Sequence, residues 1–233
     1  MPTNPICVAL DTPDLEKAVE LARALKPHVG FAKIGMEFFY AHGAAGYVRV
    51  AETGLPIFLD LKLHDIPNTV ASAMKALMRI APTPAIVNLH ATGGLDMMKA
   101  AAEAVDGRSK LIAVTILTSL SDDDIWAAGF ETAKNTEAHA RSLAELTKRA
   151  GLDGVVCSPH DLVGIRHDLG RDFLTVVPGI RPADAAVQDQ KRVATPDAAL
   201  AAGADILVIG RAITGAADPA RAAQEIGASL HAG

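Results

Sequence analysis

The sequence predicts a single (β/α)8 barrel, and three observations lead to this fold class. Short runs rich in β-branched residues alternate with longer, Ala-rich amphipathic stretches along the whole chain, which is typical of parallel βα units. There are eight such runs, the number that closes into a barrel. They are apolar throughout, as strands buried on both faces are. No linker or composition shift divides the 233 residues, so we expect residues 1–233 to form one domain.

The predicted strands are separated by helical patterns with recognisable starts. The strands are Ile6–Asp11, Gly30–Met36, Pro56–Lys62, Ala85–His90, Leu111–Leu117, Gly154–Ser158, Leu174–Pro178 and Ile206–Gly210. The clearest helices are Asp14–Leu25, Thr69–Ile80, Thr136–Ala150 and Thr195–Ala202. Asp14 and Thr195 are residue types that cap helix amino ends, and Pro196 suits a first helical position. Ser121, followed by three aspartates, likewise indicates a helix start and not a calcium loop.

Composition and charge narrow the functional classes. Half of the residues are hydrophobic but only 4% are aromatic, so the core is expected to consist mainly of Ala, Leu, Ile and Val. The net charge of −5 and the lack of a Lys/Arg block argue against a nucleic-acid surface. No apolar run approaches the roughly 20 residues of a membrane span, and the start lacks the pattern of a signal peptide. Cys7 and Cys157 each lie in an apolar run and indicate buried, reduced thiols, so we expect a soluble cytoplasmic protein.

Residues 56–69 are the most informative segment, because an apolar strand there suddenly carries charges. Asp60 and Lys62 lie two positions apart, so strand alternation places them on one face, roughly 7 Å apart along the backbone. Burying charges is costly unless they are paired, and we therefore predict a catalytic centre; a structural ion pair at a strand end is the alternative. Alternation places Asp65 on the opposite face. Either the strand ends by Leu63, or Asp65 reaches into a neighbouring subunit.

Nearly every predicted strand ends in a polar side chain or is followed by one, and a barrel brings the carboxyl ends of its strands to one rim. These residues are Asp11, Lys33, Asp60, Lys62, His90, Thr115 or Thr118, Ser158, Arg181 and Arg211. Asp11 and Lys33, with Asp60 and Lys62, would form a chain of alternating charges that keeps both lysines protonated. Lys62 would then be a proton donor, because a Schiff-base nucleophile must be neutral. For Asp11 and Lys33 a structural salt network is the alternative.

The last two βα loops predict a phosphate site. Val177–Arg181 and Ile209–Ile213 both carry a glycine shortly before an arginine, at the loops that bind phosphate in many barrels. Gly179 and Gly210 would allow the backbone close to an anion, and Arg211 offers a two-pronged contact to phosphate oxygens. Ordinary loop glycines beside solvated arginines are the alternative.

A metal site is the remaining possibility for this rim. His64 and His90, together with the aspartates, could hold a divalent cation. However, Lys33 and Lys62 would lie among the ligands and repel it. We therefore expect no metal at this site.

Taken together, these motifs resemble the orotidine 5'-phosphate decarboxylase family, in its bacterial form, over essentially the full chain. The pattern Asp60-x-Lys62-x-x-Asp65 alone is shared with a wider group of barrel decarboxylases, and its combination with Lys33 and the two terminal loops is specific. The matching segments are Leu10-Asp11, Lys33-Ile34-Gly35, Phe58 to Thr69, Asn88-Leu89-His90-Ala91, Leu117-Thr118-Ser119, Pro178-Gly179-Ile180-Arg181, Asp189-Gln190-Lys191-Arg192 and Ile209-Gly210-Arg211.

The resemblance implies conversion of orotidine 5'-phosphate to uridine 5'-phosphate, the last step of de novo UMP synthesis, by a homodimer without metal or organic cofactor. Lys62 would protonate C6 of the pyrimidine, and Asp60 would face the substrate carboxylate. Asp65 would complete the charged catalytic set from the partner subunit, together with Thr69, which would bind substrate.

The resemblance also assigns the contacts to the rest of the substrate. Asp11 and Lys33 would bind the ribose hydroxyls, with Lys33 also belonging to the catalytic set, and Thr118 would help to hold the pyrimidine. The residues that would hold the phosphate are Arg181, Gln190, Gly210 and Arg211. Apart from the resemblance, Gln190 lies in what is simply a polar surface loop.

Two other functions fit a barrel of this kind. One is a magnesium-dependent decarboxylase or aldol-type enzyme acting on a keto-sugar phosphate; such relatives carry a metal-binding glutamate where this chain has Lys33, so lysine argues against them. The other is a non-catalytic barrel that binds nucleotides, which poorly explains the set Asp60, Lys62 and Asp65.

Overall fold

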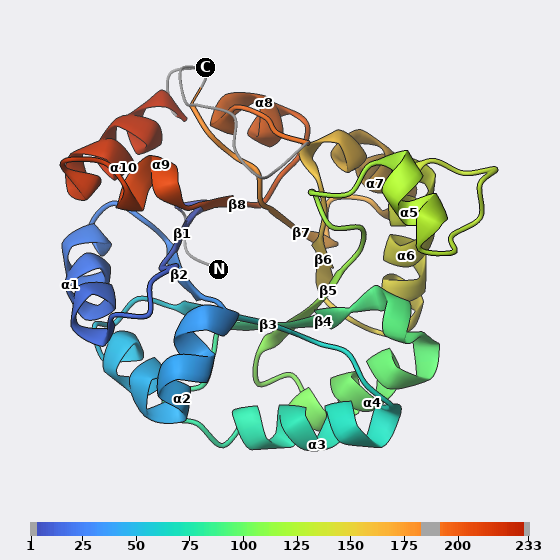
Figure 1. Cartoon of the computed structure of the whole chain (residues 1–233), viewed down its shortest axis with the longest axis horizontal. Helices are drawn as coiled ribbons and strands as arrows, with labels where there is room; N and C mark the ends of the chain where they lie inside the picture. The colour runs from blue at the N-terminus through green and yellow to red at the C-terminus, as the bar shows by residue number, and fades with distance from the viewer. Residues whose placement is uncertain (1–3, 183–191, 231–233) are drawn as a thin grey trace.

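The computed structural model describes residues 4–182 and 192–230, and its eight strands pair in chain order into one closed parallel barrel. Figure 1 looks along the barrel, with the helices packed around the ring of strands. The pairing of β1 with β8 through Cys7 and Val208 closes it. The predicted (β/α)8 fold class is therefore confirmed. The strands are β1 (Ile6–Ala9), β2 (Phe31–Ile34), β3 (Ile57–Leu63), β4 (Ile86–His90), β5 (Lys110–Val114), β6 (Gly154–Val156), β7 (Leu174–Val177) and β8 (Ile206–Ile209).

Helices follow the strands on the outside of the barrel. They are α1 (Leu15–Leu25), α2 (Met36–Ala51), α3 (Pro67–Leu77), α4 (Leu95–Val105), α5 (Asp122–Ala127), α6 (Thr136–Arg149), α7 (Leu162–Leu169), α8 (Pro196–Ala201), α9 (Arg211–Thr214) and α10 (Pro219–Ser229), with short 3-10 turns at Ala91–Gly93 and Pro159–Asp161. Most predicted strands were too long by a residue or more at their ends. The helix predicted from Thr69 begins two residues earlier, because Pro67 occupies a first helical position and not a separate turn.

The predicted helix caps are confirmed. The side chain of Asp14 accepts the Lys17 N–H at 3.0 Å, and Thr195 caps α8. Ser121 forms a capping box with Asp124, whose carboxylate accepts the Ser121 N–H at 2.8 Å. Each cap satisfies backbone donors that the first helical turn leaves without a partner.

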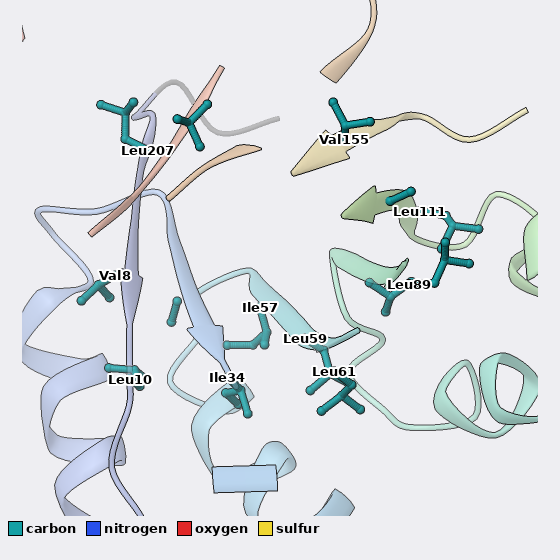
Figure 2. Packing of buried hydrophobic residues seen from close by; sticks show 14 of the residues in the cluster. Val8, Leu10, Ile34, Ile57, Leu59, Leu61, Leu89, Leu111, Val155 and Leu207 are labelled. Carbon is teal, nitrogen blue, oxygen red and sulfur yellow. The ribbon is translucent and has the colours of Figure 1, made fainter. Parts of the chain in front are cut away.

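Alternation along the strands separates two apolar layers. Outward-facing residues such as Val8, Leu10 and Leu59 pack beneath the helices (Figure 2). The inward-facing residues form a second cluster that includes Phe31 and Phe58 and fills the barrel interior. This explains why the strands are apolar throughout: both faces are buried.

The inward face becomes polar toward the carboxyl ends of the strands. Lys33 lies two residues after Phe31, Asp60 two residues after Phe58, and Asn88 two residues after Ile86. Because side chains of equal parity share a face, these polar groups lie above the apolar filling. All three are buried.

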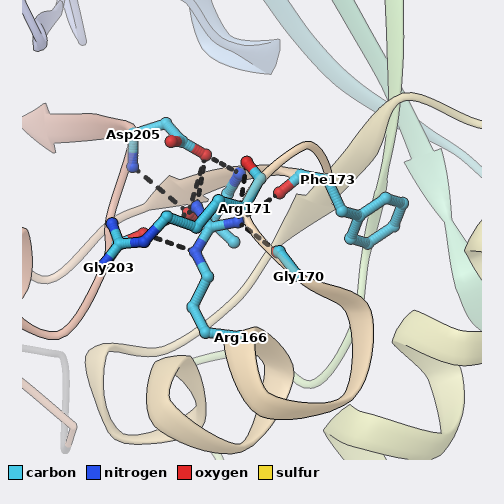
Figure 3. A network of polar contacts seen from close by, with 7 residues as sticks. Arg166, Gly170, Arg171, Phe173, Gly203 and Asp205 are labelled. Carbon is cyan, nitrogen blue, oxygen red and sulfur yellow. Dashed lines mark hydrogen bonds and ion pairs between the residues drawn. The ribbon is translucent and has the colours of Figure 1, made fainter.

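The opposite end of the barrel is held by Arg166 at the end of α7 (Figure 3). Its guanidinium donates to the carbonyls of Gly203 (2.7 Å) and Phe173 (2.6 Å). It also donates to Thr175 Oγ1 at 2.7 Å and Asp205 Oδ2 at 2.5 Å. The side chain is only 10% exposed. These contacts tie α7 to the starts of β7 and β8, far from the polar rim.

The two cysteines are buried and unpaired, as predicted. Burial raises the pKa of both thiols, Cys7 and Cys157, above the ordinary value. Neither is therefore a nucleophile near neutral pH. Within residues 4–182 and 192–230, no helix is both long and apolar enough to cross a membrane.

Candidate active site

A cavity of about 560 Å³ opens at the carboxyl ends of the strands. Its wall contains residues that lie in or directly after β1, β2, β3, β5, β7 and β8, which explains how positions so far apart in sequence meet. Eight of the predicted site residues line it: Asp11, Lys33, Asp60, Lys62, Thr118, Arg181, Gly210 and Arg211.

Four charged side chains form a continuous chain across one side of the cavity. Lys33 Nζ lies 3.0 Å from Asp11 Oδ1 and 3.5 Å from Asp60 Oδ2. Lys62 Nζ lies 2.7 Å from Asp60 Oδ1. The side chains of Lys33 and Asp60 are 11% and 10% exposed, against 25% for Lys62 and 59% for Asp11. The middle of the chain is thus desolvated, whereas Lys62 and Asp11 face the opening.

The neighbouring charges hold the buried groups of this chain in their ionised forms. Burial alone would raise the pKa of Asp60, but Lys33 and Lys62, with hydrogen bonds from Lys62 and Asn88, lower it below its usual value. Burial likewise opposes the charged form of Lys33, but Asp60 and Asp11 raise its pKa. Lys33 and Asp60 are therefore both charged near neutral pH, as the alternating pattern predicts.

Regular strand alternation ends at Lys62. Its φ is +53°, in the left-handed region that residues with a side chain rarely adopt. The pairing of β3 with β4 shifts register between Leu59 and Leu63. The predicted approach of Asp60 and Lys62 is present, at the point where the strand becomes irregular.

Asp65 and Thr69 do not line the cavity in this chain. Strand β3 ends at Leu63, which was one of the two predicted explanations for Asp65. The Asp65 side chain is exposed and accepts the Ile66 N–H at 2.6 Å. Thr69 lies in the first turn of α3 and is also exposed.

The two loops predicted to bind phosphate lie side by side at the cavity, because β7 pairs with β8. Gly179 has φ of +80°, a conformation that suits glycine and turns the chain toward Arg181. Arg211 is the first residue of α9, directly after Gly210. Gln190, the fourth residue predicted for the phosphate, lies outside the described residues.

Comparison with known proteins decides the family. Residues 4–226 match the profile of the "Orotidine 5'-phosphate decarboxylase / HUMPS family". The chain belongs to this family. The predicted resemblance is thereby confirmed.

Individual relatives match over nearly the full chain. The orotidine 5'-phosphate decarboxylase of Rhodospirillum rubrum is 50% identical, over 99% of this chain and 95% of the relative. That of Novosphingobium aromaticivorans is 52% identical, over 98% of this chain and 100% of the relative. The crystal structure of orotidine 5'-phosphate decarboxylase from Lactobacillus acidophilus has a TM-score of 0.85 at 37% identity, covering 98% of this chain and 100% of that one.

Two residues near the site were not singled out from the sequence. Asn88 is 1% exposed and bonds to Asp60 and to the backbone of Lys62. The sequence does hold a sign of this role, because Asn88 is a polar residue inside an apolar strand, two positions after the inward-facing Ile86. Arg192 is 8% exposed and donates to Asp161 Oδ1 at 2.8 Å, so part of the supposed polar surface loop is in fact buried. Nothing in the run of charges around Arg192 distinguishes it.

Other polar groups at the strand ends serve the fold. Thr115 donates its hydroxyl to the Val156 carbonyl at 3.0 Å, and Ser158 caps the turn at Pro159–Asp161. His90 and His64 lie together, with ring centroids 5.6 Å apart, but outside the cavity lining. Among the described residues, no group of three or more His, Cys, Asp or Glu is arranged to hold a metal ion.

A second cavity, of about 670 Å³, opens at the amino ends of the strands. Two of its charged residues, Lys110 and Asp153, pair with each other at 2.6 Å. At least two of the charged groups in this cavity therefore pair with each other. The chemistry that the sequence predicts is concentrated in the first cavity.

Proposed function

We propose that this chain decarboxylates orotidine 5'-phosphate to uridine 5'-phosphate, with Lys62 as the proton donor to C6. The observation that carries this proposal is the charge chain at the cavity, in which the Lys62 ammonium lies at the partly exposed end, 2.7 Å from a buried carboxylate. Membership of the family supports the substrate and the reaction.

The arrangement suits the chemistry of this reaction. When the bond between C6 and the carboxylate carbon breaks, carbon dioxide leaves. The electron pair of that bond remains on C6, which becomes a carbanion. That pair lies in the plane of the pyrimidine and is not conjugated with the ring. A preorganised cation beside C6 stabilises the developing charge, and a proton from the Lys62 ammonium then completes the new C–H bond. The resulting amine is 25% exposed and can be reprotonated from water.

Asp60 holds Lys62 and faces the departing group in this proposal. Its carboxylate is fixed by Lys33 at 3.5 Å and Lys62 at 2.7 Å. Placed near the substrate carboxylate, it would raise the energy of the bound ground state by repulsion and by desolvation. Lys33 keeps this carboxylate ionised and so belongs to the catalytic set.

Substrate contacts away from C6 supply binding energy and orientation. Asp11 and Lys33 would bind the ribose hydroxyls, and Thr118, which also lines the cavity, would help to hold the pyrimidine. Binding energy from remote groups of this kind can be used to order loops and exclude water. The proposed phosphate ligands are Arg181, Gln190, Gly210 and Arg211.

We further propose that the active form is a homodimer, in which Asp65 and Thr69 complete the site of the partner subunit. All six residues from His64 to Thr69 are exposed, and the apolar side chain of Ile66 is 66% exposed. In a dimer, Ile66 would supply an apolar contact among the polar groups of this segment. Asp65 is not among the residues that line the cavity of its own chain, which supports a contribution across the interface.

Mixing inactive variants tests the shared site. In a mixed dimer of Lys62→Ala and Asp65→Ala subunits, one site carries both substitutions and the other carries neither. Random exchange of subunits should therefore restore about a quarter of the wild-type activity, because half of the dimers are mixed and each has one intact site. No recovery, with mixed dimers demonstrated by mass spectrometry, would contradict the shared site.

The single-domain organisation over residues 1–233 and a cytoplasmic location are part of the same proposal. One closed barrel supplies all eight strands that carry the cavity. Buried, unpaired Cys7 and Cys157 suit a reducing compartment.

The metal-dependent alternative fits this geometry less well. The Lys33 ammonium lies between the carboxylates of Asp11 and Asp60, at 3.0 and 3.5 Å. It occupies the place where a divalent cation would use those oxygens and would repel that cation. Together with Lys62, 2.7 Å from Asp60, Lys33 balances the charges of the two carboxylates with cations of the protein itself.

Substitution of Lys62 tests the proposed proton donor. Lys62→Ala should almost abolish decarboxylation while the far-UV circular dichroism spectrum stays unchanged. Lys110→Ala is the matched control: Lys110 makes an equally short ion pair, 2.6 Å to Asp153, at the other end of the barrel. Turnover by Lys62→Ala near that of the control would refute this role.

A further inference from the structure

Asn88 is placed so that one side chain contacts both members of the proposed catalytic pair. It lies in the middle of β4 and is 1% exposed. Its Nδ2 donates to Asp60 Oδ1 at 2.7 Å. Its Oδ1 accepts the backbone N–H of Lys62 at 2.8 Å. The amide therefore joins the Asp60 carboxylate to the Lys62 backbone.

The contact with Lys62 falls where the strand geometry is unusual. Lys62 is left-handed, with φ of +53°, a conformation that costs on the order of 1 kcal/mol or more for a residue with a side chain. The β3–β4 ladder is interrupted between Leu59 and Leu63, so an alternative acceptor is needed for the Lys62 N–H. Asn88 provides that acceptor and stabilises the turn of the chain that directs the Lys62 side chain.

The contact with Asp60 fixes the other partner. Oδ1 of Asp60 accepts from Asn88 Nδ2 and from Lys62 Nζ, both at 2.7 Å. Its second oxygen, Oδ2, faces Lys33 at 3.5 Å. With a donor on each side, the carboxylate has little freedom to rotate. Its orientation is set in part by a neutral group that takes no part in the chemistry.

We propose that Asn88 is a positioning residue that holds the Asp60 carboxylate and the Lys62 ammonium in their working geometry. This inference rests on the proposed decarboxylation and adds to it a residue that acts through the other two. Displacement of a reacting group by about 1 Å can cost on the order of 100-fold in rate. The effect of losing Asn88 should therefore appear in turnover and not in the remote contacts with phosphate.

The first test compares two asparagine substitutions that each remove one donated and one accepted side-chain hydrogen bond. Asn4 also donates one side-chain hydrogen bond, to His28 O at 2.8 Å, and accepts one, from Ile6 N at 2.9 Å, but at the amino end of the barrel. Asn88→Ala should lower kcat by about 100-fold, with the dissociation constant for uridine 5'-phosphate changed by less than about 3-fold. Asn4→Ala should keep the wild-type kcat.

The outcomes separate the inference from the function on which it rests. Wild-type protein that does not turn over orotidine 5'-phosphate would refute the proposed function and the inference with it. An active wild type together with an equally active Asn88→Ala would overturn the inference alone. Equal losses of kcat in Asn88→Ala and Asn4→Ala would also overturn it, because they would indicate a general loss of structure.

A second variant covers the case in which Asn88→Ala does not fold. Asn88→Asp has nearly the same shape and still offers an acceptor to Lys62 N–H, but when ionised it cannot donate to Asp60. A proton shared by the two carboxylates restores that donation, so kcat of Asn88→Asp relative to wild type should rise as the pH falls from 8 to 5. A ratio that stays constant over this range would overturn the inference.

The surroundings of position 88 make this ratio interpretable. The cations nearest to the Asp60 carboxylate are Lys33 on β2 and Lys62 on β3. Burial, followed by the charges of His64 and Lys62, lowers the pKa of His90, two residues further along β4. The inward residues of the neighbouring β5, Ile112 and Val114, are apolar. All of these groups, and the phosphate of the substrate, are present in both Asn88→Asp and the wild type. Their own effects on the pH dependence of kcat therefore cancel in the ratio.

Discussion

Replacing Asp60 by asparagine removes the negative charge that separates two lysines at the cavity. Its oxygens lie 2.7 Å from Lys62 Nζ and 3.5 Å from Lys33 Nζ. At an effective dielectric constant of about 20, the two attractions amount to about 6 and about 5 kcal/mol. Desolvation offsets much of this, at several kcal/mol per ion. Because asparagine leaves two cations facing each other in a site that is only partly hydrated, we expect Asp60→Asn to lower the free energy of unfolding by about 3–5 kcal/mol.

Thermal and urea unfolding at pH 7 measure this loss directly. For a chain of this size each kcal/mol lowers Tm by about 2–4 °C, so the expected decrease is roughly 10 °C. Asp153→Asn is the matched control: its ion pair with Lys110 is as short, 2.6 Å, but the side chains are 32% and 51% exposed. That variant should lose no more than about 1 kcal/mol. A loss in Asp60→Asn no larger than in Asp153→Asn would show that the buried charge of Asp60 does not stabilise the fold.

Three further predictions concern pH, thiol reactivity and the far end of the barrel. In the folded protein the pKa of Asp60 is lowered and that of Lys33 is raised. The stability that ionised Asp60 contributes is therefore lost only as the pH falls below its unfolded pKa of about 3.9. The stability that charged Lys33 contributes is lost only as the pH rises above its unfolded pKa of about 10.4. The free-energy difference between wild type and Asp60→Asn should thus shrink as the pH falls below about 4, and urea titrations in which wild type and variant lose stability equally below that pH would contradict the assignment. Because burial raises the pKa of Cys7 and Cys157, Ellman's reagent at pH 8 should label them only after denaturation; prompt labelling of the native protein would show that they are accessible. Arg166→Lys should lower Tm by several degrees with kcat unchanged, because an ammonium lacks the planar guanidinium that reaches Thr175 and the carbonyls of Gly203 and Phe173. A fall in kcat without a fall in Tm would contradict this structural role.

Much of the fold and of the cavity lining could be predicted because both depend on strand parity. Lys33 and Asp60 continue the inward faces that begin with Phe31 and Phe58. A closed barrel then brings such positions together whatever their separation in sequence. The eight apolar runs therefore predicted the architecture, and the residues that follow them predicted most of the charged lining. That residues 1–233 act as one domain stays a prediction.

The other features of the site could not be predicted from the alternation of side chains along the strands. The left-handed backbone of Lys62 and the register shift beside it arise from contacts between strands. The role of Asn88 follows from that same irregularity. Burial of Arg192 requires Asp161 on another loop as its partner, and no local pattern indicates such a pairing. The assignment of Asp65 to a partner subunit still rests on the resemblance together with its exposure.

We propose that this barrel decarboxylates orotidine 5'-phosphate by means of its own charged side chains. The most direct test is to follow the loss of orotidine 5'-phosphate absorbance with purified protein in excess chelator, and to identify the product. We expect rapid loss with uridine 5'-phosphate as the product, and almost none with Lys62→Ala. No loss in chelator, with activity on a keto-sugar phosphate after magnesium is added, would contradict it.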